Sequence, residues 1–255
     1  MLFSMDIGNT CSNIGIFKGD NLVAFARMST DHHRTEDQYA IEILSIMKLH
    51  NINRADIHGA IFSSVVPNLS YTIKMAIKKA LNVDAISVGP GVKTGLNIKI
   101  DNPSQLGADL VCAAVAAIAH YPLPCIVLDL GTATTISYIN EKGEFLGGSI
   151  APGIGTSLEA LVSKTSMLQM VDLENPDNIV GTNTISSIKS GIIFGNAAMM
   201  DGMVDRIEEE YGKVASIIAT GGRAPSIIKH CKKDIISDQN LLMEGLRLIY
   251  NKNVK

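Results

Sequence analysis

The sequence has 255 residues, of which 46% are hydrophobic and 18% are charged, enough to build one large domain or two lobes of ordinary size. Its 22 Lys and Arg residues are balanced by 25 Asp and Glu residues, which gives a net charge of -3. A nucleic-acid-binding domain usually carries a basic face, so this balance argues against nucleic acid as a partner.

The composition also argues against a secreted or membrane protein. Residues 1–6 contain no basic stretch followed by an apolar core, as a signal peptide would. The most apolar helical segment, residues 111–119, is far shorter than the roughly 20 residues that a membrane span needs. The cysteines are widely spaced and form no CxxC pair, which indicates free thiols and not a disulfide framework or metal cluster: Cys11, Cys112, Cys125 and Cys231. We therefore expect a cytoplasmic protein with no membrane partner.

The first half of the chain is predicted to open with strands and then to alternate helices with strands. After an apolar segment that ends at residues 6–10, two strands at 13–17 and 22–28 are joined by a turn at 18–21. Thr35 is predicted to cap a helix with an apolar face at residues 40, 43, 44 and 47. A strand at 60–66, a helix from Pro67 and a strand at 85–88 follow.

The second half begins as the first one does, 123 residues later. The apolar segment 125–128 precedes Asp129, and two strands at 134–139 and 145–150 flank a turn at 141–144. A long helix at 184–211, a strand at 215–219 and a final helix at 241–250 follow. The repeat predicts two related lobes, residues 1–121 and 122–255, each with mixed sheets covered by helices. The boundary is placed where Pro122 and Pro124 interrupt a helix.

Each half supplies a carboxylate and then glycine and small polar residues at the point where its first strand ends. These residues are Asp6 with 8–10 and Asp129 with 131–132. Glycine allows phosphates to approach backbone N–H groups, and carboxylates bind the Mg²⁺ that accompanies them. One such loop alone can be an ordinary strand–turn. Two loops at matching places predict a nucleotide held in the cleft between the lobes, with Asp6 as a magnesium ligand.

These loops and four further motifs, in their order along the chain, resemble those of the type III pantothenate kinase family. The further motifs lie at 91–109, 147–153, 181–184 and 220–222. This family is part of the acetate kinase, sugar kinase, Hsp70 and actin superfamily. The resemblance implies an α/β fold with two similar actin-like (ribonuclease H-like) lobes, each a mixed β-sheet with flanking helices. It also implies phosphorylation of pantothenate by ATP to 4′-phosphopantothenate, the first step of coenzyme A biosynthesis, by a homodimer.

The resemblance assigns roles to individual residues. It implies K⁺ or NH₄⁺ at Asp129, where the residues alone leave Mg²⁺ as an alternative. The implied ATP-binding residues are Asp6, Ile7, Gly8, Asn9, Thr10, Cys11, Ser12, Asn13, Thr132, Gly221 and Gly222. The implied pantothenate-binding residues are Ile100, Gly107, Ala108, Asp109, Leu110 and Thr184.

Asp109 is the predicted catalytic residue, because the resemblance implies that it accepts the proton of the pantothenate hydroxyl. The alternative is that this carboxylate only complements a helix dipole. Two positions depart from the family pattern: Leu110 replaces an arginine and Ile100 replaces a tyrosine. The arginine would pair with an anionic group and the tyrosine would add a hydroxyl. The departures keep two alternatives open: a kinase of another small hydroxy acid, and a catalytically weak nucleotide-binding regulator.

Overall fold

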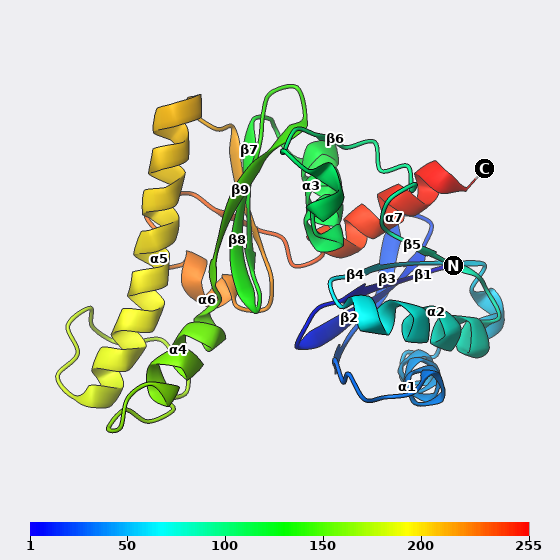
Figure 1. Cartoon of the computed structure of the whole chain (residues 1–255), viewed down its shortest axis with the longest axis horizontal. Helices are drawn as coiled ribbons and strands as arrows, with labels where there is room; N and C mark the ends of the chain where they lie inside the picture. Colours follow the sequence, from blue (N-terminus) through cyan, green and yellow to red (C-terminus); the bar gives the residue numbers. More distant parts are fainter. Residues whose placement is uncertain (255) are drawn as a thin grey trace. The chain divides into compact units, whose positions relative to one another are not determined.

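The computed structural model describes residues 1–254, which form two compact units (Figure 1). The first unit contains Met1–Leu96, Asp101–Ala116 and the chain from Asn240 onward. The second contains Asn97–Ile100 and Ala117–Gln239. The units differ from the predicted lobes 1–121 and 122–255 in three segments. Residues 97–100 and 117–121 lie in the second unit, and the chain from Asn240 lies in the first, because the C-terminal helix packs against its strands.

The first unit is built on a five-stranded sheet in the order β3-β2-β1-β4-β5. Strand β1 pairs with β2 in antiparallel and with β4 in parallel orientation. The strands are β1 (Leu2–Ile7), β2 (Cys11–Lys18), β3 (Asn21–Ser29), β4 (Gly59–Ser64) and β5 (Ala85–Ser87). The helices are α1 (Glu36–Leu49), α2 (Pro67–Leu81), α3 (Ala108–His120, of which the residues to Ala116 lie in this unit) and α7 (Leu241–Asn253). Short 3₁₀ turns lie at Arg54–Asp56 and Pro103–Gln105.

The two faces of this sheet have different chemistry, because side chains alternate along each strand. Phe3, Met5 and Ile7 of β1 belong to an apolar core with α1 and α2. Ser4 and Asp6 lie on the opposite face, where α7 packs on β1 and the Ser4 hydroxyl donates to the Met243 sulfur at 3.5 Å. The polar end of β1 is thus separated from the main core by the sheet itself.

The helix predicted after Thr35 is confirmed with its cap. Thr35 Oγ1 accepts a hydrogen bond from the Gln38 backbone N–H, and Gln38 Oε1 accepts one from the Thr35 N–H at 2.9 Å. This reciprocal capping box satisfies backbone donors that would otherwise lack a partner.

The second unit repeats the strand order of the first. Its six strands follow the order β11-β10-β7-β8-β9-β6, so β9-β8-β7-β10-β11 corresponds to β3-β2-β1-β4-β5. The strands are β6 (Asn97–Ile98), β7 (Cys125–Leu130), β8 (Ala133–Ile139), β9 (Glu144–Pro152), β10 (Ser216–Thr220) and β11 (Ile236–Ser237). The two mixed sheets with flanking helices confirm the predicted fold class and the internal repeat.

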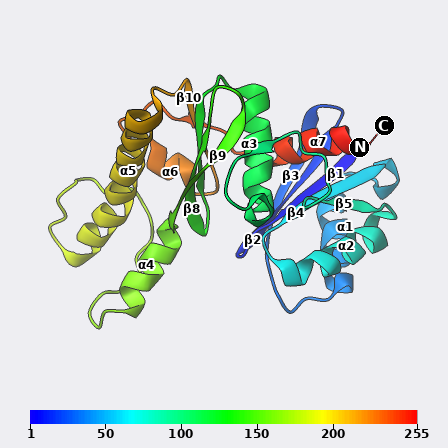
Figure 2. The ribbon, with the colours of Figure 1, turned by 45° about the horizontal axis from the view of Figure 1, so that its top comes forward.

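Helices α4 (Ile154–Ser163), α5 (Thr184–Tyr211) and α6 (Ala224–Ile228) build the apolar core of the second unit on one face of its sheet. Figure 2 shows the length of α5, whose bounds agree with the prediction. The glycine-rich motif at 147–153 continues strand β9 to Pro152, and α4 begins at Ile154. Within residues 1–254, no helix is both long and apolar enough to cross a bilayer.

Candidate functional site

Asp6 is a buried carboxylate at the end of β1, with 6% of its surface exposed. It is flanked in register by Asn13 on β2 and by Ser63 on β4. Ser63 Oγ donates a hydrogen bond to Asp6 Oδ1 at 2.7 Å. Burial raises the pKa of Asp6 from 3.8 to about 7, against the opposing effect of the Ser63 hydrogen bond. The site therefore favours a partner that brings positive charge to this carboxylate.

Asp109 lies in the first turn of α3, in the same unit as Asp6. The Leu110 backbone N–H donates to Asp109 Oδ1 at 2.8 Å. Burial raises the pKa of Asp109, and the charge of Asp109 contributes to the raised pKa of Asp6. Two carboxylates from distant parts of the sequence are therefore near enough to sense each other.

The turn between β1 and β2 carries the first predicted phosphate loop. Gly8 N–H donates to the Cys11 carbonyl at 3.1 Å, and Asn9 and Thr10 are exposed. Ile7 is fully buried in the core, and the Ser12 hydroxyl is 2.8 Å from that of Thr30. In this loop the exposed groups belong to residues 9 and 10, whereas the side chains of residues 7 and 12 serve the fold.

The second unit gathers its own polar groups at the carboxyl ends of the parallel strands β7 and β10. Asp129 on β7 is half-buried and in register with Thr220 on β10. Gly221 follows with φ +92°, and a Cβ there would lie 2.7 Å from Asp129 Oδ1. Gly222 is exposed. Ligands of α/β sheets commonly bind outside this end of the strands.

The second predicted phosphate loop is held against the start of α4. Gly131 N–H donates to the Ala133 carbonyl, and Gly153 N–H donates to the Thr132 carbonyl, both at 3.0 Å. Thr156 Oγ1 also donates to the Thr132 carbonyl, at 2.8 Å. The exposed tip of this turn is therefore fixed by α4 while its residues remain open to solvent.

The predicted pantothenate residues are distributed over both units. Residues 107–110 lie together at the start of α3 in the first unit. Ile100 lies beside Gly147 in the second unit, and Thr184 is the first residue of α5. The structure thus groups residues 107–110 but leaves Ile100 and Thr184 on other elements.

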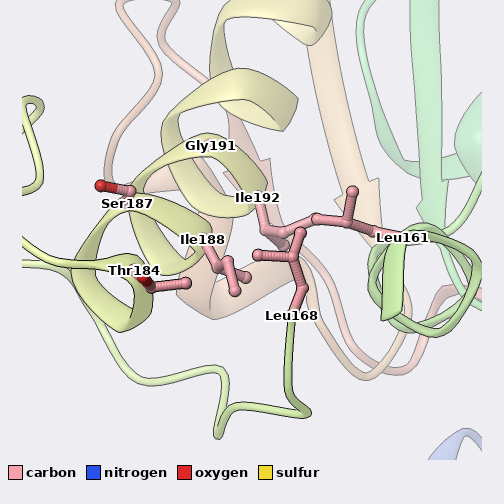
Figure 3. Close-up of a pocket in the computed structure, with 7 residues that line it drawn as sticks. All are labelled: Leu161, Leu168, Thr184, Ser187, Ile188, Gly191 and Ile192. Carbon is pink, nitrogen blue, oxygen red and sulfur yellow. The ribbon is translucent and has the colours of Figure 1, made fainter. Parts of the chain in front are cut away.

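Thr184 lines a cavity of about 460 Å³ between α4, α5 and the segment that joins them. Figure 3 shows the side chains of Leu168, Ile188 and Ile192 beside one another, whereas the Ser187 hydroxyl points away from them. Leu161 and Gly191 complete the lining. The cavity wall is mainly apolar, and the sequence patterns did not predict it.

Sequence reasoning also missed Ser63 as a neighbour of Asp6. The available signal was a pair of serines, Ser63 and Ser64, within the otherwise apolar strand predicted at 60–66. A polar side chain there needs a buried partner, but the sequence does not say which strand lies alongside.

Comparisons with known proteins agree along the whole chain. The family model for type III pantothenate kinases matches residues 2–206. A type III pantothenate kinase of Brevibacillus brevis is 42% identical over 253 residues, which cover 99% of each chain. One of Exiguobacterium sp. is 43% identical over 255 residues, which cover 100% of each chain.

Solved structures of lower similarity share the fold. The activator of the 2-hydroxyisocaproyl-CoA dehydratase from Clostridium difficile, with bound ADPNP, has a TM-score of 0.60 at 17% identity, covering 100% of this chain and 98% of its own. The (R)-2-hydroxyglutaryl-CoA dehydratase component A of Acidaminococcus fermentans has a TM-score of 0.57 at 17% identity, with both chains fully covered.

Proposed function

The chain belongs to the type III pantothenate kinase family, and we infer from this that it phosphorylates pantothenate with ATP. The product is 4′-phosphopantothenate, and the reaction is the first step of coenzyme A biosynthesis. The observation that carries this conclusion is 42–43% identity over essentially the full length of named pantothenate kinases. The carboxylates Asp6 and Asp109 in one unit are compatible with it, since phosphoryl transfer depends on positioning and on charge neutralisation.

Asp109 is our candidate for the group that orients the acceptor hydroxyl and receives its proton. Its raised pKa, caused by burial, makes the carboxylate a better proton acceptor than an exposed aspartate. The Leu110 N–H holds Oδ1, which leaves Oδ2 as the oxygen that faces the hydroxyl in this proposal. The backbone thereby fixes the orientation of the carboxylate.

Asp6 and the two loops are our candidates for nucleotide binding. Asp6 presents a buried carboxylate whose ionised form is disfavoured without a nearby cation, so its donor chemistry fits Mg²⁺ bound with ATP. When bound, Mg²⁺ would neutralise charge on the phosphates. Ser63 and Asn13 hold the carboxylate in place, and the backbone of the exposed residues 9, 10 and 132 would donate to phosphate oxygens.

At Asp129 we propose a monovalent cation, K⁺ or NH₄⁺. The carboxylate lies where the parallel strands β7 and β10 end, and its oxygens suit a hard cation. We also propose that the enzyme acts in the cytoplasm as a homodimer, as the resemblance implies. Light scattering of the purified chain would measure the oligomeric state.

For pantothenate we propose residues 107–110 with Ile100 and Thr184. Leu110 and Ile100 supply apolar surface where the family pattern has arginine and tyrosine, so fewer polar contacts reach the acceptor. The proposal therefore includes a high KM for pantothenate.

A coupled ADP-release assay tests the function directly. Turnover that requires pantothenate, with a phosphorylated product found by mass spectrometry, is the expected result. Turnover only with another hydroxy acid would show that this acid, and not pantothenate, is the acceptor. Nucleotide binding without turnover on any acceptor would overturn the kinase assignment.

A further inference from the structure

The internal repeat places two equivalent rows of polar side chains across the two sheets. In the first unit the row is Asn13–Asp6–Ser63 on β2, β1 and β4. In the second unit the row is Thr135–Asp129–Thr220 on β8, β7 and β10. Residues opposite each other in a ladder point to the same face of the sheet, so each carboxylate has a polar side chain on both sides.

The two rows differ in their hydrogen bonds. In the first row both neighbours bond the carboxylate: Ser63 at 2.7 Å, and Asn13 through its side chain. In the second row Thr135 Oγ1 is buried and has no hydrogen-bond partner within residues 1–254. A buried hydroxyl without a partner loses the hydrogen bonds to water that it makes in the unfolded chain, which destabilises the fold. Such a group in a native protein needs an explanation, and a bound ion is one of them.

We propose that Thr135 is a ligand-binding residue whose hydroxyl oxygen, together with the Asp129 carboxylate, coordinates a hard cation. This inference rests on the proposed cation role of Asp129 and adds a second residue to that site.

The chemistry of the row favours a cation over an anion. Asp129 brings negative charge, and the neighbouring side chains on both sides carry hydroxyl groups. The lone pairs of a hydroxyl oxygen can coordinate K⁺ or Mg²⁺ and can accept a hydrogen bond from NH₄⁺. An anion would face the carboxylate. Gly221 packs directly against the carboxylate, because a Cβ there would lie 2.7 Å from Asp129 Oδ1.

The adjacent residue offers a matched control. Thr134 also has a buried hydroxyl without a partner within the described residues. It is opposite Leu130, a member of the apolar core, and thus lies on the other face of β8 from Asp129. Replacing either threonine with valine keeps a β-branched side chain of similar shape and puts a methyl group in place of the hydroxyl.

The experiment measures thermal unfolding of the full chain at constant ionic strength, with choline chloride replaced stepwise by KCl, NH₄Cl or MgCl₂. Each protein is compared with its own value in choline, so that a general change in stability cancels. We expect a saturable rise in the Tm of the native chain with at least one of these cations. Thr135→Val should raise the midpoint cation concentration at least tenfold, whereas Thr135→Ser and Thr134→Val should retain the native midpoint.

The three salts separate the sources of the effect. A response to KCl or NH₄Cl identifies a monovalent site, and a response to MgCl₂ alone identifies a divalent one; both support the proposal. A native midpoint in Thr135→Val, or no cation response in the native chain, would overturn it. Failure of the proposed function is a separate outcome, namely absence of pantothenate-dependent ADP release in the native chain.

Discussion

Replacing Asp6 with asparagine should stabilise the fold above neutral pH while it stops phosphoryl transfer. The pKa of Asp6 is raised to about 7 in the folded chain, against 3.8 for an ordinary aspartate, because the carboxylate is buried. Between pH 4 and 7 the folded state therefore holds a proton that the unfolded state has released. The free energy of unfolding must fall as the pH rises through this window.

The magnitude follows from the same values. At 1.36 kcal/mol per pH unit, the ionised carboxylate costs the folded state about 4 kcal/mol above pH 7. The asparagine side chain would carry no charge at any pH and would keep an oxygen that accepts from Ser63. We expect Asp6→Asn to gain about 2–4 kcal/mol at pH 8 and close to nothing at pH 4. For a chain of this length the gain at pH 8 corresponds to roughly 4–16 °C in Tm.

The assay is thermal unfolding by circular dichroism at several pH values from 4 to 8, without nucleotide or Mg²⁺, for the native chain and the variant. Asp234→Asn, which changes an exposed aspartate, is the control and should leave Tm within about 1 °C of native at pH 8. An equal gain at pH 4 and pH 8, or a loss of stability at pH 8, would refute the conclusion that the ionised Asp6 carboxylate destabilises the folded chain. The activity of the same variant should be lost while its stability at pH 8 rises, which is a trade-off between stability and activity.

Three further predictions concern catalysis, packing and the acceptor site. Asp109→Asn should lower kcat by roughly 100- to 10,000-fold with little change in ATP affinity, and near-native turnover would remove Asp109 from catalysis. Gly245→Ala should destabilise the chain by about 1–3 kcal/mol in chemical denaturation, because a Cβ at this position would overlap the Cys112 carbonyl oxygen; a native midpoint would contradict this packing. Leu110→Arg with Ile100→Tyr should lower the KM for pantothenate about 10- to 100-fold in steady-state kinetics, since a charge-assisted contact contributes roughly 1.5–3 kcal/mol. Loss of all activity in this double variant would instead indicate a pocket adapted to leucine and isoleucine.

The elements that the sequence predicted best are those with a strong local signal. Thr35 with Gln38 indicates the start of α1, and the two apolar segments ending in Asp6 and Asp129 indicate the internal repeat. Strand pairing and the contacts of Asp6 depend on long-range packing. The register that puts Ser63 opposite Asp6 joins residues 57 positions apart, and no local pattern encodes it.

The short elements escaped prediction for a related reason. Strands β6 and β11 are two residues long and form only because a neighbouring strand offers free backbone groups. Their sequences carry no period that could be recognised. The buried hydroxyl of Thr135 is likewise visible only once β7 and β8 are paired.

The first unit is assembled from the beginning and the end of the chain, and this has a consequence for its folding during synthesis on the ribosome. Strand β1, drawn in blue in Figure 1, is made first, but α7, drawn in red, packs on it and is translated after the whole stretch 117–239. At a translation rate of about 5–20 residues per second, α7 is synthesised on the order of ten seconds or more after β1 and β4. During this interval the α7 side of their sheet lacks Met243 and Leu246, which are buried in the finished fold. Nascent chains arrested before residue 241 should therefore bind chaperones that complete chains release.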